Sequence, residues 1–235
     1  MYKVIFFDLV NTLVRYDPPP EEHQGWALRQ LGIEVSRENL RRGFWIGNDF
    51  FTRQSAHRSI EKRSAREKEQ IWLEYELAML RGAGIDATPK LAAEVLGLAR
   101  QLERRIVLFE DTVAALGALR DQGLTLGLVS NLDMTLDQFC PEVDLAPHLD
   151  FVIVSHEVGF EKPHPEIFEV ALERAGAEPS EAIMVGDQYH SDIVGAIAAG
   201  IKPLWLDRDG VFGDIFENGS EHARIGALTE ILEHL

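Results

Sequence analysis

Three carboxylates and one lysine draw attention because they lie beside apolar runs that are typical of buried strands. Asp8 ends the run that opens the chain, Asp187 ends the run 182–187, and Asp192 follows five residues later. Lys162 lies in the loop after another such run. Carboxylate oxygens are ligands that Mg²⁺ prefers, and an ammonium group can hold phosphate oxygens. These residue types therefore suit a site for a divalent cation and a phosphate group.

A hydroxyl and an amide add to this set. Ser130 and Asn131 end the apolar run 124–130. Because ligands of open parallel sheets gather at the carboxyl ends of the strands, we expect all these residues to converge. Plainer interpretations remain open at this point: Ser130 simply ends a strand, Lys162 is a surface charge, and Asp192 caps a helix.

The elements that position these residues follow from the apolar pattern. Continuous apolar runs predict strands buried on both faces of a parallel sheet, at 2–8, 124–130, 150–155, 182–187 and 201–206. Segments that close with a glycine predict helices between them, at about 111–123, 164–176 and 190–200. Asp111 is expected to be the N-cap of the first of these helices. The alternation predicts an α/β fold.

A long segment after the first strand contains no convincing strand. It predicts helices at about 20–31, 37–56, 61–82 and 89–105. Its junctions with the core, near 14–19 and 105–110, are expected to form a hinge. We therefore expect a core domain of residues 1–15 and 107–235, interrupted by an all-helical domain of residues 16–106.

Charge and cysteine content narrow the classes of function. The chain has 23 Lys and Arg against 39 Asp and Glu, a net charge of −16, which disfavours binding to nucleic acid or anionic membranes. An anionic substrate then requires a local cation. Cys140 is the only cysteine, which excludes an intramolecular disulfide and a multi-thiolate zinc site. The single cysteine fits a reducing, cytoplasmic setting. Because the chain is acidic and no apolar stretch has the length of a membrane helix, we expect neither nucleic-acid nor membrane partners.

Two other sets of residues are weaker candidates for chemistry. Cys140 precedes a proline without a surrounding motif, so a role as nucleophile is disfavoured. His156, His164 and His190 lie near the candidate loops but lack the spacing of metal ligands.

Four motifs occur in the order found in the haloacid dehalogenase (HAD) superfamily. They are FFDLVNTL at 6–13, LGLVSN at 126–131, KPHPEIF at 162–168 and MVGDQYHSDIVGA at 184–196. The helical insertion lies where members with a C1 helical cap carry theirs. The chain thus resembles a HAD hydrolase with a C1 cap, which implies a Rossmann-like parallel sheet core (the HAD fold) with an inserted all-helical cap domain.

The resemblance also implies roles for the acidic residues. Asp8 matches the nucleophilic aspartate, which forms an aspartyl-phosphate that water hydrolyses. The metal site implied for Mg²⁺ includes Asp8, the backbone carbonyl of Val10 and Asp187. Asp192 is counted with this metal site and matches the acid that orients a metal-bound water or Lys162.

The same resemblance assigns the phosphate-binding groups. Ser130, the N–H of Asn131 and Lys162 match the residues that hold phosphate oxygens. Asp8, Ser130 and Lys162 are therefore the expected catalytic residues.

Val10 departs from the family pattern. Phosphatase members usually carry a second aspartate there, which protonates the leaving group, and its loss costs about 10²–10⁴-fold in rate. Members that cleave carbon–halogen bonds also lack this aspartate, but they usually have an aromatic residue at the position and no metal. Valine matches neither pattern.

The spacing of Asp187 and Asp192 resembles that of metal-dependent phosphatases. We therefore expect a Mg²⁺-dependent phosphatase of small phosphorylated metabolites, acting as a monomer or homodimer. Without the usual acid, the enzyme either acts on substrates with good leaving groups or uses the carboxylate of Asp133 or Asp17 as the proton donor. If it does neither, its turnover is slow. The alternatives are a catalytically impaired HAD-fold binding protein and a metal-independent 2-haloacid dehalogenase.

Overall fold

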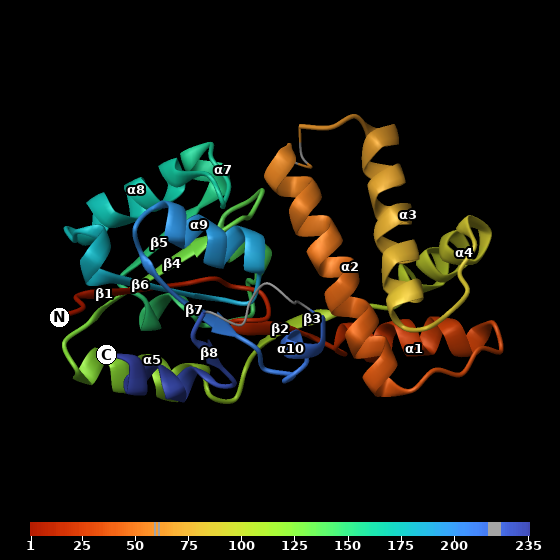
Figure 1. Cartoon of the computed structure of the whole chain (residues 1–235), viewed down its shortest axis with the longest axis horizontal. Helices are drawn as coiled ribbons and strands as arrows, with labels where there is room; N and C mark the ends of the chain where they lie inside the picture. Colours follow the sequence, from red (N-terminus) through yellow and green to blue (C-terminus); the bar gives the residue numbers. More distant parts are fainter. Residues whose placement is uncertain (59, 61, 216–221) are drawn as a thin grey trace. The chain divides into compact units, whose positions relative to one another are not determined.

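A computed structural model of the protein describes residues 1–58, 60, 62–215 and 222–235. The backbone divides into two compact units (Figure 1). The first unit combines Met1–Arg15 with Ile106–Leu235, and the second is Tyr16–Arg105. Within the described residues, no helix has both the length and the apolar character needed to cross a bilayer.

A parallel sheet forms the centre of the first unit. Its strand order is β5-β4-β1-β6-β7-β8, and every neighbouring pair is parallel. The strands are β1 (Val4–Phe7), β4 (Thr125–Ser130), β5 (Phe151–Val154), β6 (Ala182–Gly186), β7 (Lys202–Leu206) and β8 (Arg224–Ile225). The predicted α/β fold with a parallel sheet is confirmed. The sequence did not predict β8, because two residues are too few to show a periodicity.

Helices cover both faces of this sheet (Figure 1). The longer ones are α5 (Thr112–Asp121), α8 (Pro165–Ala175) and the C-terminal 3₁₀ helix Leu228–His234. The shorter ones are α6 (Leu136–Phe139), α7 (Ser155–Val158), α9 (Gly195–Ala198), α10 (Phe212–Ile215) and the 3₁₀ turns Ala146–His148 and Pro179–Glu181. The predicted helix 190–200 is instead a π turn, Tyr189–Val194, followed by α9.

Strand β1 shows why a strand of this sheet must be apolar throughout. Ile5 and Phe7 belong to the apolar cluster that includes residues of α5 and the C-terminal helix. Val4 and Phe6 belong to the cluster on the opposite face, which includes residues of α8. All four side chains are completely buried, so β1 is fixed at the centre of the core.

The second unit is helical. Its helices are α1 (Pro20–Gln30), α2 (Arg37–His57), α3 (Ala65–Gly82) and α4 (Pro89–Ala99). The expected start of α3 at residue 61 lies outside the described residues; the helix begins after Ser64, which forms a capping box with Glu67. The predicted helix 89–105 is too long, because it ends at Ala99.

Two short strands lie where the chain passes between the units. β2 (Val14–Asp17) and β3 (Arg105–Leu108) pair to form a two-stranded sheet. Arg105 Nη2 also lies 2.6 Å from Asp17 Oδ2. The sequence indicated junctions at both places but no strands, since four residues without alternation carry little signal.

Small residues allow the helices of the second unit to pack closely. A Cβ at Gly43 of α2 would collide with the backbone carbonyl of Met79 and with Ala83. The buried apolar cluster between the helices is accordingly made mainly of alanine and leucine. The second unit therefore has a hydrophobic core of its own.

A carboxyl group is buried among these helices. Glu76 is completely buried, and the Gln24 amide donates a hydrogen bond of 3.0 Å to its Oε2. Glu76 Oε1 and Gln24 Oε1 have no hydrogen-bond partner among the described residues. Burial raises the pKa of Glu76 to about 7, and the Gln24 hydrogen bond only partly opposes this. The folded protein thus keeps Glu76 protonated at a pH where the unfolded chain ionises it.

Replacement Glu76→Gln should stabilise the protein at pH 8 and have little effect at pH 5. Because the pKa of Glu76 is higher in the folded state, wild-type stability falls as pH rises from about 4.5 to about 7 and then levels off. At pH 8 the replacement should increase the free energy of unfolding by up to about 3 kcal/mol. Urea unfolding at both pH values measures it, with Glu69→Gln on the exposed side of α3 as the control. Equal shifts at the two pH values would contradict the expectation.

Candidate active site

The register of the sheet brings Asp8, Ser130 and Asp187 together. Phe7, the last residue of β1, pairs with residues of both β4 and β6. Asp8 follows directly, Ser130 is the last residue of β4, and Asp187 follows β6. All three lie at the carboxyl edge of the central strands, where the order of the sheet reverses and ligands of such folds bind.

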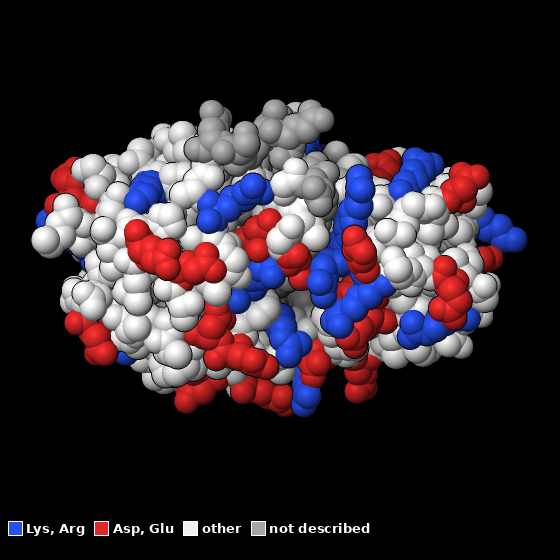
Figure 2. Space-filling model, turned by 60° about the horizontal axis from the view of Figure 1, so that its bottom comes forward, with Lys and Arg blue, Asp and Glu red and all other residues white. Residues whose placement is uncertain are grey.

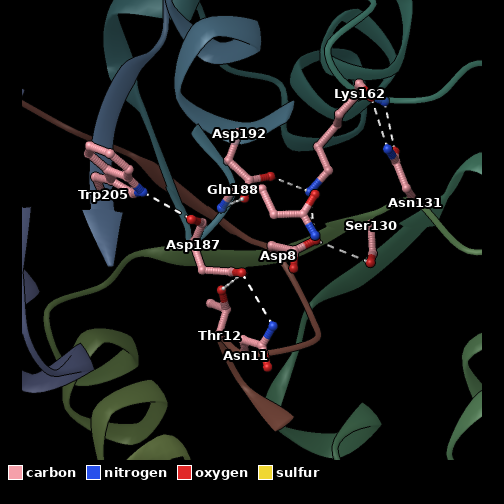
Figure 3. A network of polar contacts seen from close by, with 10 residues as sticks. All are labelled: Asp8, Asn11, Thr12, Ser130, Asn131, Lys162, Asp187, Gln188, Asp192 and Trp205. Carbon is pink, nitrogen blue, oxygen red and sulfur yellow. Dashed lines mark hydrogen bonds and ion pairs between the residues drawn. The ribbon is translucent and has the colours of Figure 1, made fainter. Parts of the chain in front are cut away.

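A buried ion-pair network links Asp8, Lys162 and Asp192 (Figure 3). Lys162 Nζ lies 2.7 Å from Asp8 Oδ1 and 2.6 Å from Asp192 Oδ1. The Lys162 side chain is only 1% exposed, so its interpretation as a surface charge is wrong. Burial lowers the pKa of Lys162, but the charges of Asp192 and Asp8 outweigh it and give a net rise. The ammonium group therefore stays charged between two carboxylates.

Asn131 holds the backbone that carries this lysine. Its Nδ2 donates to the Lys162 carbonyl at 2.9 Å, and its Oδ1 accepts from the Lys162 N–H at 2.7 Å. The sequence pointed to the backbone N–H of Asn131 as a phosphate ligand and missed this function of its side chain. An amide that pairs with a peptide group has no sequence signature when the partners are far apart in the chain.

Asp192 has both carboxylate oxygens engaged. Oδ1 accepts from Lys162, and Oδ2 accepts from the backbone N–H of Gln188 at 2.9 Å. A Cβ at Gly186 would overlap this carboxylate, so only glycine leaves room for it. Burial raises the pKa of Asp192 to about 6, although Lys162 opposes the rise. Asp192 orients Lys162 and accepts a bond from the Gln188 N–H, but the π helix has Gln188 as its N-cap and no side-chain capping bond, so the helix-capping interpretation of Asp192 is wrong.

The carboxylate of Asp187 contacts the side chains of two residues that follow Asp8 closely in the sequence. Thr12 Oγ1 donates to Asp187 Oδ1 at 3.2 Å, and Asn11 Nδ2 lies 3.4 Å from Oδ2 (Figure 3). Trp205 Nε1 donates to the Asp187 backbone carbonyl at 2.9 Å. These partners of Asp187 were not predicted from the sequence. The residue type of Asn11 is the one local indication of a special backbone position in this loop. Asparagine tolerates the left-handed conformation, which Asn11 adopts here with a φ of 64°.

The acidic cluster suits a divalent cation. Oxygens of Asp8, Asp187 and Asp192 lie within 4.8 Å of one another. Burial, followed by the charges of Asp8 and Asp192, raises the pKa of Asp187 well above its usual value. Three carboxylates face one ammonium group, so a bound Mg²⁺ would balance the charge with the oxygen ligands it prefers. The Val10 carbonyl accepts no backbone hydrogen bond from the described residues.

Residues considered as alternatives do not join this cluster. Cys140 is buried, and burial raises the pKa of its thiol, which disfavours a thiolate nucleophile. His156 and His164 are exposed, and within the described residues the three aspartates form the one group with metal-ligand geometry. Asp133 is exposed in the loop after β4, and Asp17 pairs with Arg105.

Loss of the buried ammonium should destabilise the metal-free protein strongly. Lys162→Met leaves Asp8 and Asp192 without their shared partner, which costs about 3–5 kcal/mol at pH 7. Lys3→Met is the matched control, because Lys3 forms an ion pair with Glu181 while its side chain is 61% exposed. Such an exposed pair contributes little to stability, because water and salt screen it. Urea unfolding in the presence of EDTA measures the free energy of unfolding of both variants. Equal losses of stability in Lys162→Met and Lys3→Met would contradict the buried network.

Comparisons with known proteins identify the family and the fold of this chain. The haloacid dehalogenase-like hydrolase family matches residues 2–200. Glyceraldehyde 3-phosphate phosphatase of Methanopyrus kandleri is 30% identical over 217 residues, and ribulose-1,5-bisphosphate 5-phosphatase of Halopiger xanaduensis is 28% identical over 211; each alignment covers 88% of this chain and 85% of the relative. A crystal structure of 2-haloacid dehalogenase from Pseudomonas syringae is 26% identical with a TM-score of 0.56, covering 99% of this chain and 97% of that one. This chain therefore belongs to the haloacid dehalogenase-like hydrolase family and shares its fold.

Proposed function

We propose that this hydrolase is a Mg²⁺-dependent phosphatase of small phosphorylated molecules. The observation that carries the proposal is the cluster of Asp8, Asp187 and Asp192 around a single ammonium group, that of Lys162. A site with this excess of buried negative charge requires a cation before it can admit a phosphate. Relatives named as phosphatases of glyceraldehyde 3-phosphate and of ribulose 1,5-bisphosphate support the substrate class.

The proposed reaction begins with attack by Asp8 on phosphorus. Asp8 Oδ1 is held by Lys162 at 2.7 Å and by the Ser130 hydroxyl at 3.3 Å, while Oδ2 has no hydrogen-bond partner among the described residues. The new O–P bond forms as the bond to the leaving group breaks, and water then hydrolyses the aspartyl-phosphate. Ser130, Lys162 and the Asn131 N–H bind the phosphate oxygens.

The proposed metal ligands are Asp8, Asp187 and the Val10 carbonyl. Asp192 supports them by fixing Lys162, since both of its oxygens are already engaged. Bound Mg²⁺ would neutralise charge on the phosphate oxygens during transfer.

Local positive charge is needed because the protein is acidic overall. The net charge is −16, and Figure 2 shows acidic side chains beside many of the basic ones on the face in view. Several arginines are paired in this way, for example Arg37 with Glu21 and Arg53 with Asp49. Surface arginines thus add little net attraction for an anion, and Lys162 with the bound cation must supply it.

The helical unit Tyr16–Arg105 is proposed to be the cap domain of this enzyme. The expected boundaries were 16–106 for the cap and 1–15 with 107–235 for the core, so they differ from the two units at Ile106. Its insertion between β1 and β4, through the paired strands β2 and β3, supports this assignment. We further propose that the protein is a monomer or homodimer. A location in the cytoplasm is proposed as well, and the reduced, buried thiol of Cys140 supports it.

Replacement Asp8→Asn should abolish Mg²⁺-dependent phosphate release, because an amide of the same shape cannot attack phosphorus. Activity on an aryl phosphate should fall below a few per cent of wild type, while the exposed control Asp121→Asn should retain full activity. A 2-haloacid is assayed in parallel with and without Mg²⁺. Metal-independent halide release would instead identify a dehalogenase, and phosphate binding without turnover would identify a binding protein.

Valine at position 10 should make the rate depend steeply on the leaving group. Val10 is half-buried against the core cluster and offers no proton, so alkoxides should leave far more slowly than nitrophenolates. Val10→Asp should raise the rate on alkyl phosphates by about 10²-fold and on aryl phosphates much less. Val10→Asn is the control of equal size without an acid. Equal gains on both substrate types would show that another group already donates the proton.

A further inference from the structure

We propose that Arg208 is a positioning residue for the site, because it holds the backbone of Thr12 and thereby keeps the Thr12 hydroxyl on Asp187. The expected effect on Mg²⁺ rests on the proposed function. The effect on the loop from Asp8 to Val14 does not depend on it.

Arg208 lies in the loop after β7 and is fixed by three separate contacts. Its Nη2 donates to the Thr12 carbonyl at 2.8 Å. Its Nη1 lies 3.1 Å from Asp111 Oδ2, and its Nη2 lies 3.0 Å from Asp111 Oδ1. The guanidinium carbon stacks 3.9 Å from the centre of the Phe109 ring. A planar, forked cation can make all these contacts at once, which lysine cannot.

Thr12 connects this arginine to the acidic cluster. It is completely buried, its carbonyl accepts from Arg208, and its hydroxyl donates to Asp187 Oδ1 at 3.2 Å. The next carbonyl, that of Leu13, accepts from the Thr112 hydroxyl at 2.7 Å. Two successive carbonyls of the loop are thus held from outside it, so the Thr12 hydroxyl has little freedom to leave Asp187.

Asp111 ties the arginine to the C-terminal part of the chain. It was expected to cap α5, but it makes no capping bond there. Its Oδ2 accepts instead from the Leu228 N–H at 2.9 Å as well as from Arg208. The Arg208 loop is itself anchored by Asp207, whose carboxylate accepts from the N–H groups of Val211 and Phe212 at 3.0 Å. The guanidinium is therefore held in place before any ligand binds.

Groups that support a metal ligand from outside change metal affinity when they are removed. Loss of a direct hydrogen-bond partner of a ligand typically costs about 10–100-fold in affinity. Thr12 is such a partner of Asp187. Arg208 does not contact Asp187 in this way but binds the backbone of Thr12. Arg208→Gln should therefore weaken Mg²⁺ binding by about 10-fold, near the lower end of that range.

The test compares Arg208→Gln and Arg208→Lys with Arg120→Gln. Arg120 is a matched control, because it also contacts a backbone carbonyl, that of Pro147, and an aspartate, Asp150, yet touches no site residue. Hydrogen exchange of the amides of residues 11–14 is measured in EDTA, and Mg²⁺ affinity is measured by calorimetry. Arg208→Gln should exchange faster and bind Mg²⁺ more weakly, Arg208→Lys should be intermediate, and Arg120→Gln should match wild type.

A double variant separates positioning from simple anchoring. If Arg208 acts through Thr12, Arg208→Gln should change Mg²⁺ affinity much less in a Thr12→Val background than in wild type. Unchanged loop exchange in Arg208→Gln, or faster exchange with unchanged affinity, would overturn the inference. A wild-type protein that binds no Mg²⁺ would overturn the proposed function instead, and the exchange result would still decide whether Arg208 holds the loop.

Discussion

The buried ammonium of Lys162, placed between Asp8 and Asp192, is the interaction on which the site depends. Three ionised groups are removed from water here, and each would be strongly unfavourable without fixed partners. Their positions are set by elements far apart in the chain: the end of β1, the loop before α8 and the π turn after β6. The parallel sheet supplies the rigid edge from which all three project.

Most of the surrounding polar contacts serve this arrangement. The Asn131 amide fixes the lysine backbone, the Gln188 N–H fixes Asp192, and Trp205 fixes the carbonyl of Asp187. The lysine does not neutralise the whole cluster, because Asp187 adds a further buried carboxylate. The structure thereby combines a firmly held carboxylate at Asp8, the proposed nucleophile, with an excess of acidic groups, which is the electrostatic condition for binding a cation and then a phosphate.

The two units differ in what opposes the burial of their carboxyl groups. In the first unit, Asp8 and Asp192 share the ammonium group of Lys162, which opposes the rise that burial causes in the pKa of Asp192. In the second unit, Glu76 has a single hydrogen bond from Gln24, and burial favours its neutral form. The difference follows from the balance between desolvation and nearby charge. A buried cation is thus placed where the proposed chemistry needs charged carboxylates, and the helical core avoids an unpaired charge.

The sequence by itself determined the α/β fold, the main strands and helices, and the convergence of Asp8, Ser130, Lys162 and Asp187, because apolar runs and strand ends are local features. Only the tertiary structure decided which other side chains fix these site residues by hydrogen bonds and ion pairs. The bond from Arg208 to Thr12 joins residues 196 positions apart, and Asp111 binds Leu228 rather than capping its own helix. The pairing of β2 with β3 is equally non-local. Such contacts depend on distances in the folded chain, which no pattern of neighbouring residues records.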